Sequence, residues 1–233
     1  MPICCVDAGH NKNTIDSGAL GCGLFEQDIT LDIAIRLKPL LESNGIQVVM
    51  TRTGDRVPGD YPDVAGSLQA RCDISNDAKA YLFVSIHCNA GHGTGSEVWI
   101  VSEGGRAEKA AKAVLARLIA SCGWTNRGVK TANDYVLKNT IAPAILTENG
   151  FIDTVSDAVK LSSPGFRQGI AVAHAKGICD YFGMQYRDGG VTVAEVKPDK
   201  DGYLLVRVLD SKSAEVQAQI IKMGYACSKL MLP

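Results

Sequence analysis

Two histidines and one glutamate stand at or just past the ends of short apolar runs: His10, His87 and Glu148. Neutral imidazoles and carboxylates are ligands for zinc, and a catalytic zinc site uses three protein ligands and keeps a fourth position open for water. A carboxylate that is not a ligand can take a proton from that water and later give it to a leaving amine. The residue types at these positions therefore indicate metal-assisted hydrolysis.

A second glutamate, Glu26, is placed by a helical pattern. The spacing of apolar residues predicts a helix over 24–43, in which Glu26 occupies the first turn and shares one face with Ile33 and Leu37. A solvated glutamate is unusual on a core-facing stripe, so we expect this carboxylate to point at a site above the sheet.

These four side chains fit two roles, with His10, Glu26 and His87 as metal ligands and Glu148 as the base. The ligands are scattered and lack the compact spacing of a His-Glu-x-x-His helix, so their spacing alone is not specific. Each residue also has an ordinary structural interpretation, as a hydrogen-bonded histidine, a first-turn glutamate favoured by the helix dipole, or a strand-end glutamate paired with an arginine. All four together favour the site.

The elements that must bring these residues together alternate between strand and helix. Strands are predicted at 3–8, 46–50, 80–87, 96–101 and 143–148, and helices at 24–43, 67–79, 104–122 and 163–181. Short extended pieces are predicted at 126–130 and 135–137, and loops at 9–23 and 53–66. This alternation is typical of an α/β fold with a mainly parallel, twisted sheet and helices on both faces. Sites in such folds form outside the carboxyl ends of the strands.

Bulk properties exclude several classes of protein. The 233 residues carry a formal net charge of −1 without a block of like charge, which gives no support for a nucleic-acid or membrane-surface partner. No apolar run reaches the ~18 residues of a membrane-spanning helix, and no export signal precedes the first strand, so we expect synthesis in the cytoplasm without membrane insertion. The eight cysteines lie mostly within apolar runs and are expected as buried free thiols.

A series of motifs follows the chain in order. They are Asp-x-Gly-His at 7–10, a glycine-rich loop, Glu26, Thr-Arg at 51–52, Arg-x-x-x-x-Asn at 71–76, Ser-Ile-His-x-Asn at 85–89, Gly-x-Glu at 95–97, Asn-Arg-Gly-Val-Lys at 126–130 and Glu-x-Gly-Phe at 148–151. Over residues 2–183 the sequence resembles the zinc-dependent N-acetylmuramoyl-L-alanine amidases of the type 3 family. Ala8 replaces a common proline and Cys88 a usual alanine, and neither change removes a functional group.

The resemblance implies a peptidoglycan hydrolase that cleaves the amide between N-acetylmuramic acid and the L-alanine of the stem peptide. It implies one zinc ion bound by His10, Glu26 and His87, with Glu148 as the catalytic residue. The segment 88–106 is too short for the inhibitory helix of cell-division members, which favours an open site as in phage endolysins and spore-former autolysins. Without an export signal, the protein would reach the wall through a holin pore or after lysis of the cell.

Residues near the strand ends are candidates for substrate binding. Asn89, two residues past His87, is expected to orient the site or the substrate. Asn126, Arg127 and Lys130 have two open interpretations, since they either bind the stem peptide or merely form an edge turn.

The C-terminal part follows a different pattern. We predict a catalytic domain at 1–183, a linker at 184–190 and a small α+β C-terminal domain at 191–233, with a helix at 213–223. About 40 residues are marginal for independent stability, so this appendage is expected to dock on the main domain or to pair with a copy of itself. Wall binding and homo-oligomerisation are its alternative roles.

Two other functions stay open at this point. A zinc exopeptidase acting on free peptides would share the metal chemistry, and a non-catalytic wall-binding module would share the fold. A cysteine nucleophile at Cys22 or Cys88 would need a free histidine beside it, which the metal assignment does not leave. His174 is expected on the face of the last helix and His92 in a surface loop, both without a metal role.

Overall fold

The computed structural model describes residues 1–12, 15–59, 61–188, 193–198 and 204–208. The chain divides into two compact units, Met1–Arg187 and Asp188–Pro233. Met184 and Tyr186, which the sequence placed in the linker, pack against the core of the first unit.

Of the second unit, the structure describes two strands. β9 (Val193–Pro198) and β10 (Leu204–Val208) pair in antiparallel fashion. The helix expected at 213–223 lies outside the described residues.

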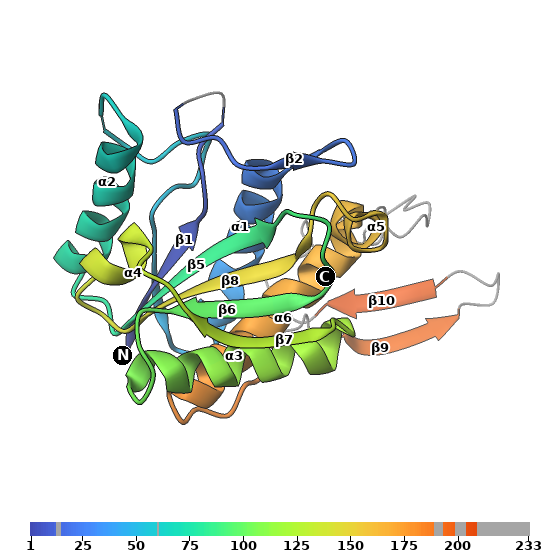
Figure 1. The fold of residues 1–233 in the computed structure, drawn as a ribbon. Helices are drawn as coiled ribbons and strands as arrows, with labels where there is room; N and C mark the ends of the chain where they lie inside the picture. The colour runs from blue at the N-terminus through green and yellow to red at the C-terminus, as the bar shows by residue number, and fades with distance from the viewer. Residues whose placement is uncertain (13–14, 60, 189–192, 199–203, 209–233) are drawn as a thin grey trace. The chain divides into compact units, whose positions relative to one another are not determined.

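The first unit is built on a six-stranded sheet in the order β4-β1-β5-β8-β6-β7 (Figure 1). The strands are β1 (Ile3–Ala8), β4 (Gln47–Met50), β5 (Leu82–Asn89), β6 (Ser96–Ile100), β7 (Asn126–Thr131) and β8 (Ala144–Phe151). β1 runs parallel to β4 and β5, and β5 runs parallel to β8, whereas β6 is antiparallel to β8. The prediction of a mainly parallel sheet is confirmed, and the carboxyl ends of β1, β5 and β8 lie at one edge.

Alternate residues of the central strands build a large core on one face of the sheet. This face is covered by α1 (Glu26–Ser43), α3 (Arg106–Cys122) and α6 (Pro164–Tyr181) (Figure 1). Val84 and Ile145 from the strands are fully buried there, as are Leu37 and Ile178 from the helices. Each such side chain contributes roughly 1.5–3 kcal/mol of burial energy, so this layer holds most of the fold's hydrophobic stabilisation.

A smaller core lies on the opposite face, under α2 (Val64–Asp77) and α4 (Tyr135–Asn139). The Asp63 carboxylate accepts a hydrogen bond from Gly66 N at 2.8 Å, which caps α2 and explains its start at residue 64. Helices on both faces were predicted and are confirmed.

Three local predictions were wrong. Residues 135–137, expected as an extended piece, begin α4, because Val136 and Leu137 are adjacent on a helix of only five residues and both turn toward the smaller core. Within the loop expected at 9–23, β2 (Leu20–Gly21) forms a strand that pairs with β3 (Leu24–Phe25). β3 occupies the expected start of the helix, so α1 begins at Glu26 rather than at residue 24.

One short helix was not predicted, α5 (Val155–Ser162). Val155 and Val159 are 70% and 64% exposed, whereas Ala158 and Leu161 are buried. Apolar residues therefore lie on both faces of this helix, and their spacing does not indicate which face is buried. Among the described residues, none of the helices combines the length and apolarity needed to span a membrane.

Candidate active site

The strand register places three acid–base side chains in one row across the sheet. His87 on β5 pairs with Glu148 on β8, and Glu148 pairs in turn with Glu97 on β6. Paired residues project to the same side of a sheet, here the side of the smaller core, and directly opposite residues have Cβ atoms roughly 4.5–5.5 Å apart. The expected convergence of strand ends is therefore present, with Glu97 as an added member.

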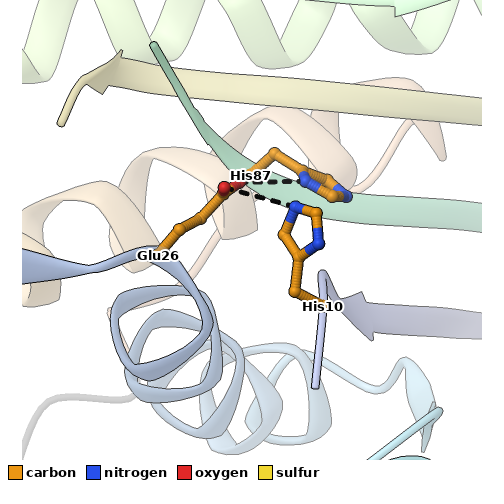
Figure 2. Close-up of side chains that lie close together, drawn as sticks. All are labelled: His10, Glu26 and His87. Carbon is orange, nitrogen blue, oxygen red and sulfur yellow. Dashed lines mark hydrogen bonds and ion pairs between the residues drawn. The ribbon is translucent and has the colours of Figure 1, made fainter. Parts of the chain in front are cut away.

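His10, Glu26 and His87 come together at the open end of this row (Figure 2). Glu26 Oε2 lies 3.2 Å from His10 Nε2, and Glu26 Oε1 lies 3.0 Å from His87 Nδ1. The ring centroids of the two histidines are 4.8 Å apart, in an edge-to-face arrangement. Glu26 is 3% exposed although it begins a helix, as its place on the core-facing stripe indicated.

The donor set fits a metal ion of the size of zinc. One potential ligand atom from each of the three residues lies within 4.8 Å of the others. Atoms that bind one zinc ion at ~2.0–2.1 Å in a tetrahedron are roughly 3.4 Å apart, close to the two distances seen here. Two imidazoles and a carboxylate are also a ligand set found in catalytic zinc sites.

In this cluster, burial and ion pairing shift the pKa values of the side chains in opposite directions. Burial disfavours the ionised form of Glu26, but His10 and His87 outweigh it and hold the pKa of Glu26 below its usual range. Burial likewise opposes protonation of His10, whereas Asp16 and Glu26 raise the pKa of His10 to about 9. Asp16 Oδ1 lies 3.4 Å from His10 Nδ1, so this carboxylate supports the ring from behind.

Two glycines make room for the side chains of the candidate ligands. A Cβ on Gly9 would lie 2.4 Å from His87 Cε1, and a Cβ on Gly18 would lie 2.8 Å from His10 Cδ2 and 2.9 Å from Glu26 Oε2. Side chains at these positions would displace the rings, which explains part of the glycine content of the loop.

His10 itself has a backbone φ of 63°, a left-handed conformation that non-glycine residues rarely adopt. Such a residue costs roughly 1–3 kcal/mol and must be held by its surroundings. Arg71, which is 1% exposed, donates from Nη2 to His10 O at 2.7 Å and from Nη1 to Ala8 O at 2.7 Å.

A carboxylate inside the fold anchors Arg71 in turn. Asp7 Oδ1 accepts from Arg71 Nη1 at 2.7 Å and from Thr51 Oγ1 at 2.6 Å, and Asp7 Oδ2 accepts from Ser85 Oγ at 2.6 Å. Burial alone would raise the pKa of Asp7, but the guanidinium and these hydroxyls lower it, so the buried group stays ionised. The first motif, at 7–10, thus joins a buried ion pair to His10, a candidate metal ligand.

Arg52 is a second buried arginine on the same turn. Its Nε donates to Ala8 O at 2.8 Å, and its Nη2 donates to Gly9 O at 2.9 Å and to Gln27 O at 2.7 Å. Because Gln27 follows Glu26 on α1, Arg52 connects the helix that carries Glu26 to the turn that carries His10.

Glu148 is half-buried, and one oxygen of its carboxyl group is enclosed by the protein. Its Oε2 atom is inaccessible to solvent and has no hydrogen-bond partner among the described residues. Burial, together with the charges of Glu26 and Glu97, raises the pKa of Glu148 well above its usual range. A carboxyl group in such surroundings is suited to exchanging a proton near neutral pH.

The predicted substrate-binding residues gather around Glu97. Asn89 Nδ2 donates to Glu97 Oε1 at 2.8 Å, Arg127 Nε donates to Glu97 Oε2 at 2.7 Å, and Lys130 Nζ donates to the same oxygen. Asn126 stands apart: its Oδ1 accepts from Gly128 N at 2.9 Å, within the turn of its own strand.

The remaining histidines and Cys88 lie outside the acid–base chemistry. His174 is fully buried between Thr147 Oγ1 and Ile170 O, and burial lowers its pKa to about 4. The His92 side chain is 85% exposed beside Asp153. Cys88 is buried, and burial with the neighbouring carboxylates raises its pKa well above its usual range, so it is a poor nucleophile.

Sequence reasoning left three positioning residues without a role: Arg52, Arg71 and Glu97. All three belong to motifs that the sequence displays, at 51–52, 71–76 and 95–97. The signal was therefore present, but only the fold reveals that these side chains bind carbonyl groups and cations beside the ligands. Asp16 carried no comparable signal in its loop.

Comparison with known proteins gives a consistent picture. The N-acetylmuramoyl-L-alanine amidase family model matches residues 4–180. The sequence is 39% identical over 183 residues to the sporulation-specific N-acetylmuramoyl-L-alanine amidase of Bacillus subtilis (strain 168), covering 77% of this chain and 68% of the relative. It is 35% identical over 215 residues to the endolysin of Bacillus phage SPP1, covering 88% of this chain and 76% of the endolysin.

Solved structures agree with the fold. The N-acetylmuramoyl-L-alanine amidase AmiC2 of Nostoc punctiforme matches with a TM-score of 0.70 and 31% identity, over 78% of this chain and 97% of that one. The match to the phage endolysin covers a larger share of the chain than Met1–Arg187 does, so that similarity continues into the second unit.

Proposed function

The chain belongs to the N-acetylmuramoyl-L-alanine amidase family, and we propose that His10, Glu26 and His87 hold its zinc ion while Glu148 carries the protons of the reaction. Members of the family hydrolyse peptidoglycan at the amide that joins N-acetylmuramic acid to L-alanine, and are generally zinc-dependent. The observation that carries the proposal is the meeting of three potential ligand atoms within 4.8 Å of one another, beside the half-buried carboxyl group of Glu148.

Two of the three candidate ligands, His10 and Glu26, are held by the chain itself. Arg71 and Asp16 fix the backbone and the ring of His10, and Cys88 N donates to Glu26 Oε1 at 3.0 Å. When bound, a zinc ion supplies a Lewis acid that polarises the amide carbonyl, lowers the pKa of a water and favours the ionised form of Glu148.

Glu148 then acts as base and acid in turn. Its carboxylate takes a proton from the attacking water, and gives that proton to the nitrogen of L-alanine as the carbon–nitrogen bond breaks. The products are a carboxylate on the muramoyl lactyl group and a stem peptide with a free amino terminus. Among the described residues, no donor competes for the Oε2 atom of Glu148.

Substrate binding is assigned to Asn89, Asn126, Arg127 and Lys130. Three of them meet on Glu97, next to Glu148 in the row, and the side chains of Arg127 and Lys130 are one-third exposed. These cations therefore lie on the surface that a peptide leaving Glu148 would cross.

Glu148→Gln tests the proposal on purified peptidoglycan. We expect about 10²–10⁴-fold slower release of stem peptides, with zinc content unchanged, because the amide cannot take up the proton. Glu42→Gln, an exposed change of the same chemistry on α1, should keep full activity. Activity of Glu148→Gln within a few-fold of the native protein would exclude this role, and release of single amino acids in place of intact stem peptides would point to an exopeptidase.

A further inference from the structure

Glu97 is a nearly buried carboxylate, 2% exposed, that faces two cations. Both of its oxygens are occupied, Oε1 by Asn89 and Oε2 by Arg127 and Lys130. A buried charge is costly unless it is paired, so one carboxylate holding two cations leaves a net positive charge fixed in place. A turn at the edge of the sheet does not require two cations on one buried carboxylate, so this arrangement favours a binding role.

The guanidinium of Arg127 is oriented and still has free donors. Its Nε atom is bound to Glu97, and its Cζ lies 4.8 Å from the centre of the Phe151 ring. Within the part of the chain that the structure describes, Nη1 and Nη2 have no hydrogen-bond partner, and the side chain is 33% exposed. A planar fork held in this way matches the two oxygens of a carboxylate.

Lys130 completes the arrangement from the same strand. Its Nζ shares Glu97 Oε2 with Arg127 and lies 5.2 Å from the centre of the Trp99 ring. The side chain is 34% exposed. An ammonium group has three N–H donors, and among the described residues only Glu97 Oε2 accepts a hydrogen bond from this one.

The distance from Glu148 sets which part of a substrate can reach these donors. Glu97 is the cross-strand partner of Glu148, one strand spacing or ~4.8 Å away, so the cations beyond it are roughly 5–10 Å from the base. Consecutive residues of a peptide are ~3.8 Å apart. A group on the second residue of the stem, one residue past the L-alanine, falls in this range.

We propose that Arg127 and Lys130, positioned by Glu97, form a receptor for a free carboxylate on the second residue of the stem peptide. The inference rests on the proposed function, because it assigns a partner to the peptide side of that substrate. It makes the enzyme selective for stems whose second residue keeps its carboxylate over stems in which that group is amidated.

Two soluble substrates test this selectivity. N-acetylmuramoyl-L-alanyl-γ-D-glutamyl-L-lysine is compared with the same compound in which the glutamyl α-carboxylate is an amide. The native protein should cleave the free acid with a kcat/KM about 10–100-fold higher, the range of a charged hydrogen-bonded contact, mainly through KM. The same preference should appear in calorimetric affinities for the two released tripeptides.

Variants locate the preference. Arg127→Gln should bring the ratio of the two substrates close to one, and Lys130→Gln and Glu97→Gln should reduce it, whereas a purely structural role would lower both rates together. Arg117→Gln, which removes a cation from an exposed pair with Asp180, should leave the ratio unchanged.

Equal affinities and equal kcat/KM values for the two forms in the native protein would overturn the receptor, as would a full preference in Arg127→Gln. If neither substrate is cleaved but the binding preference persists, the proposed function is wrong and the receptor stands. If both substrates are cleaved equally, the proposed function stands and the receptor is wrong.

Discussion

Arg71→Lys is the sharpest test of how the fold holds the metal ligands. The guanidinium makes five hydrogen bonds from two nitrogens, to Asp7 Oδ1, Ala8 O, His10 O, Asn11 Oδ1 and Asp16 Oδ2, at 2.7–3.2 Å. A lysine ammonium keeps the charge but offers three hydrogens on one atom. The variant would therefore lose at least two of these hydrogen bonds. Four of the acceptors keep another donor, which is Thr51 Oγ1 for Asp7 Oδ1, Arg52 Nε for Ala8 O, Val57 N for Asn11 Oδ1 and Ser67 Oγ for Asp16 Oδ2. Among the described residues, His10 O has no donor besides Arg71.

The expected loss of stability follows from His10 O. An unsatisfied buried polar group costs about 1–3 kcal/mol, so Arg71→Lys should lower the free energy of unfolding by about 1–3 kcal/mol. This is a measurable share of the roughly 5–15 kcal/mol of a typical domain. Urea unfolding of the metal-free proteins measures it, because bound zinc would add its own binding free energy to the native state.

Zinc affinity is the second measurement on this variant. Without the bond to His10 O, the left-handed turn at His10 should relax, and affinity should fall about 10–100-fold, as when a partner of a metal ligand is removed. Arg117→Lys, in an exposed pair, should change the unfolding free energy by less than ~1 kcal/mol and leave zinc affinity intact. A loss below ~1 kcal/mol in Arg71→Lys, or a loss of stability with unchanged zinc affinity, would refute the role given to Arg71.

Three further outcomes are expected. Zinc binding requires neutral His10, whose pKa is about 9 before zinc binds. Zinc affinity should therefore rise about tenfold per pH unit up to that pH. Calorimetry in buffers of different ionisation heat should detect about one proton released on zinc binding near neutral pH. Gly18→Ala should weaken zinc binding because its Cβ would overlap the ligands, whereas Gly54→Ala, where the added Cβ meets nothing within 4 Å, should be neutral in the same titration. Burial lowers the pKa of His174 from 6.5 to about 4, so His174 takes up a proton on unfolding between these two pH values. The free energy of unfolding should therefore decline by up to about 3 kcal/mol as pH falls from 6.5 to 4. In urea unfolding, His174→Gln should reduce this dependence of stability on pH.

The sequence predicted which candidate residues lie close together where residue type and periodicity are local signals. His10, His87 and Glu148 follow apolar strands, and parallel strands bring such ends to one edge. Glu26 was placed by the helical stripe that it shares with buried Leu37, because a helix keeps residues at these spacings on one face.

The remainder depends on contacts that exist only in the folded chain. Arg52 and Arg71 look like surface cations in the sequence, yet they are buried because the turn at 8–10 exposes carbonyl oxygens that need donors. α4 was missed for a related reason: five residues carry too little periodicity, and the smaller core decides their conformation.

The pairing of His87, Glu148 and Glu97 across three strands has a consequence for the fidelity of folding. Side chains alternate between faces, so a slip of β8 by one residue would send its carboxyl group to the opposite side of the sheet. A chain trapped in that register could be compact and helical, with normal circular dichroism, and still release no peptide. Lytic activity per mole of folded protein is therefore a direct assay of correct strand pairing during refolding.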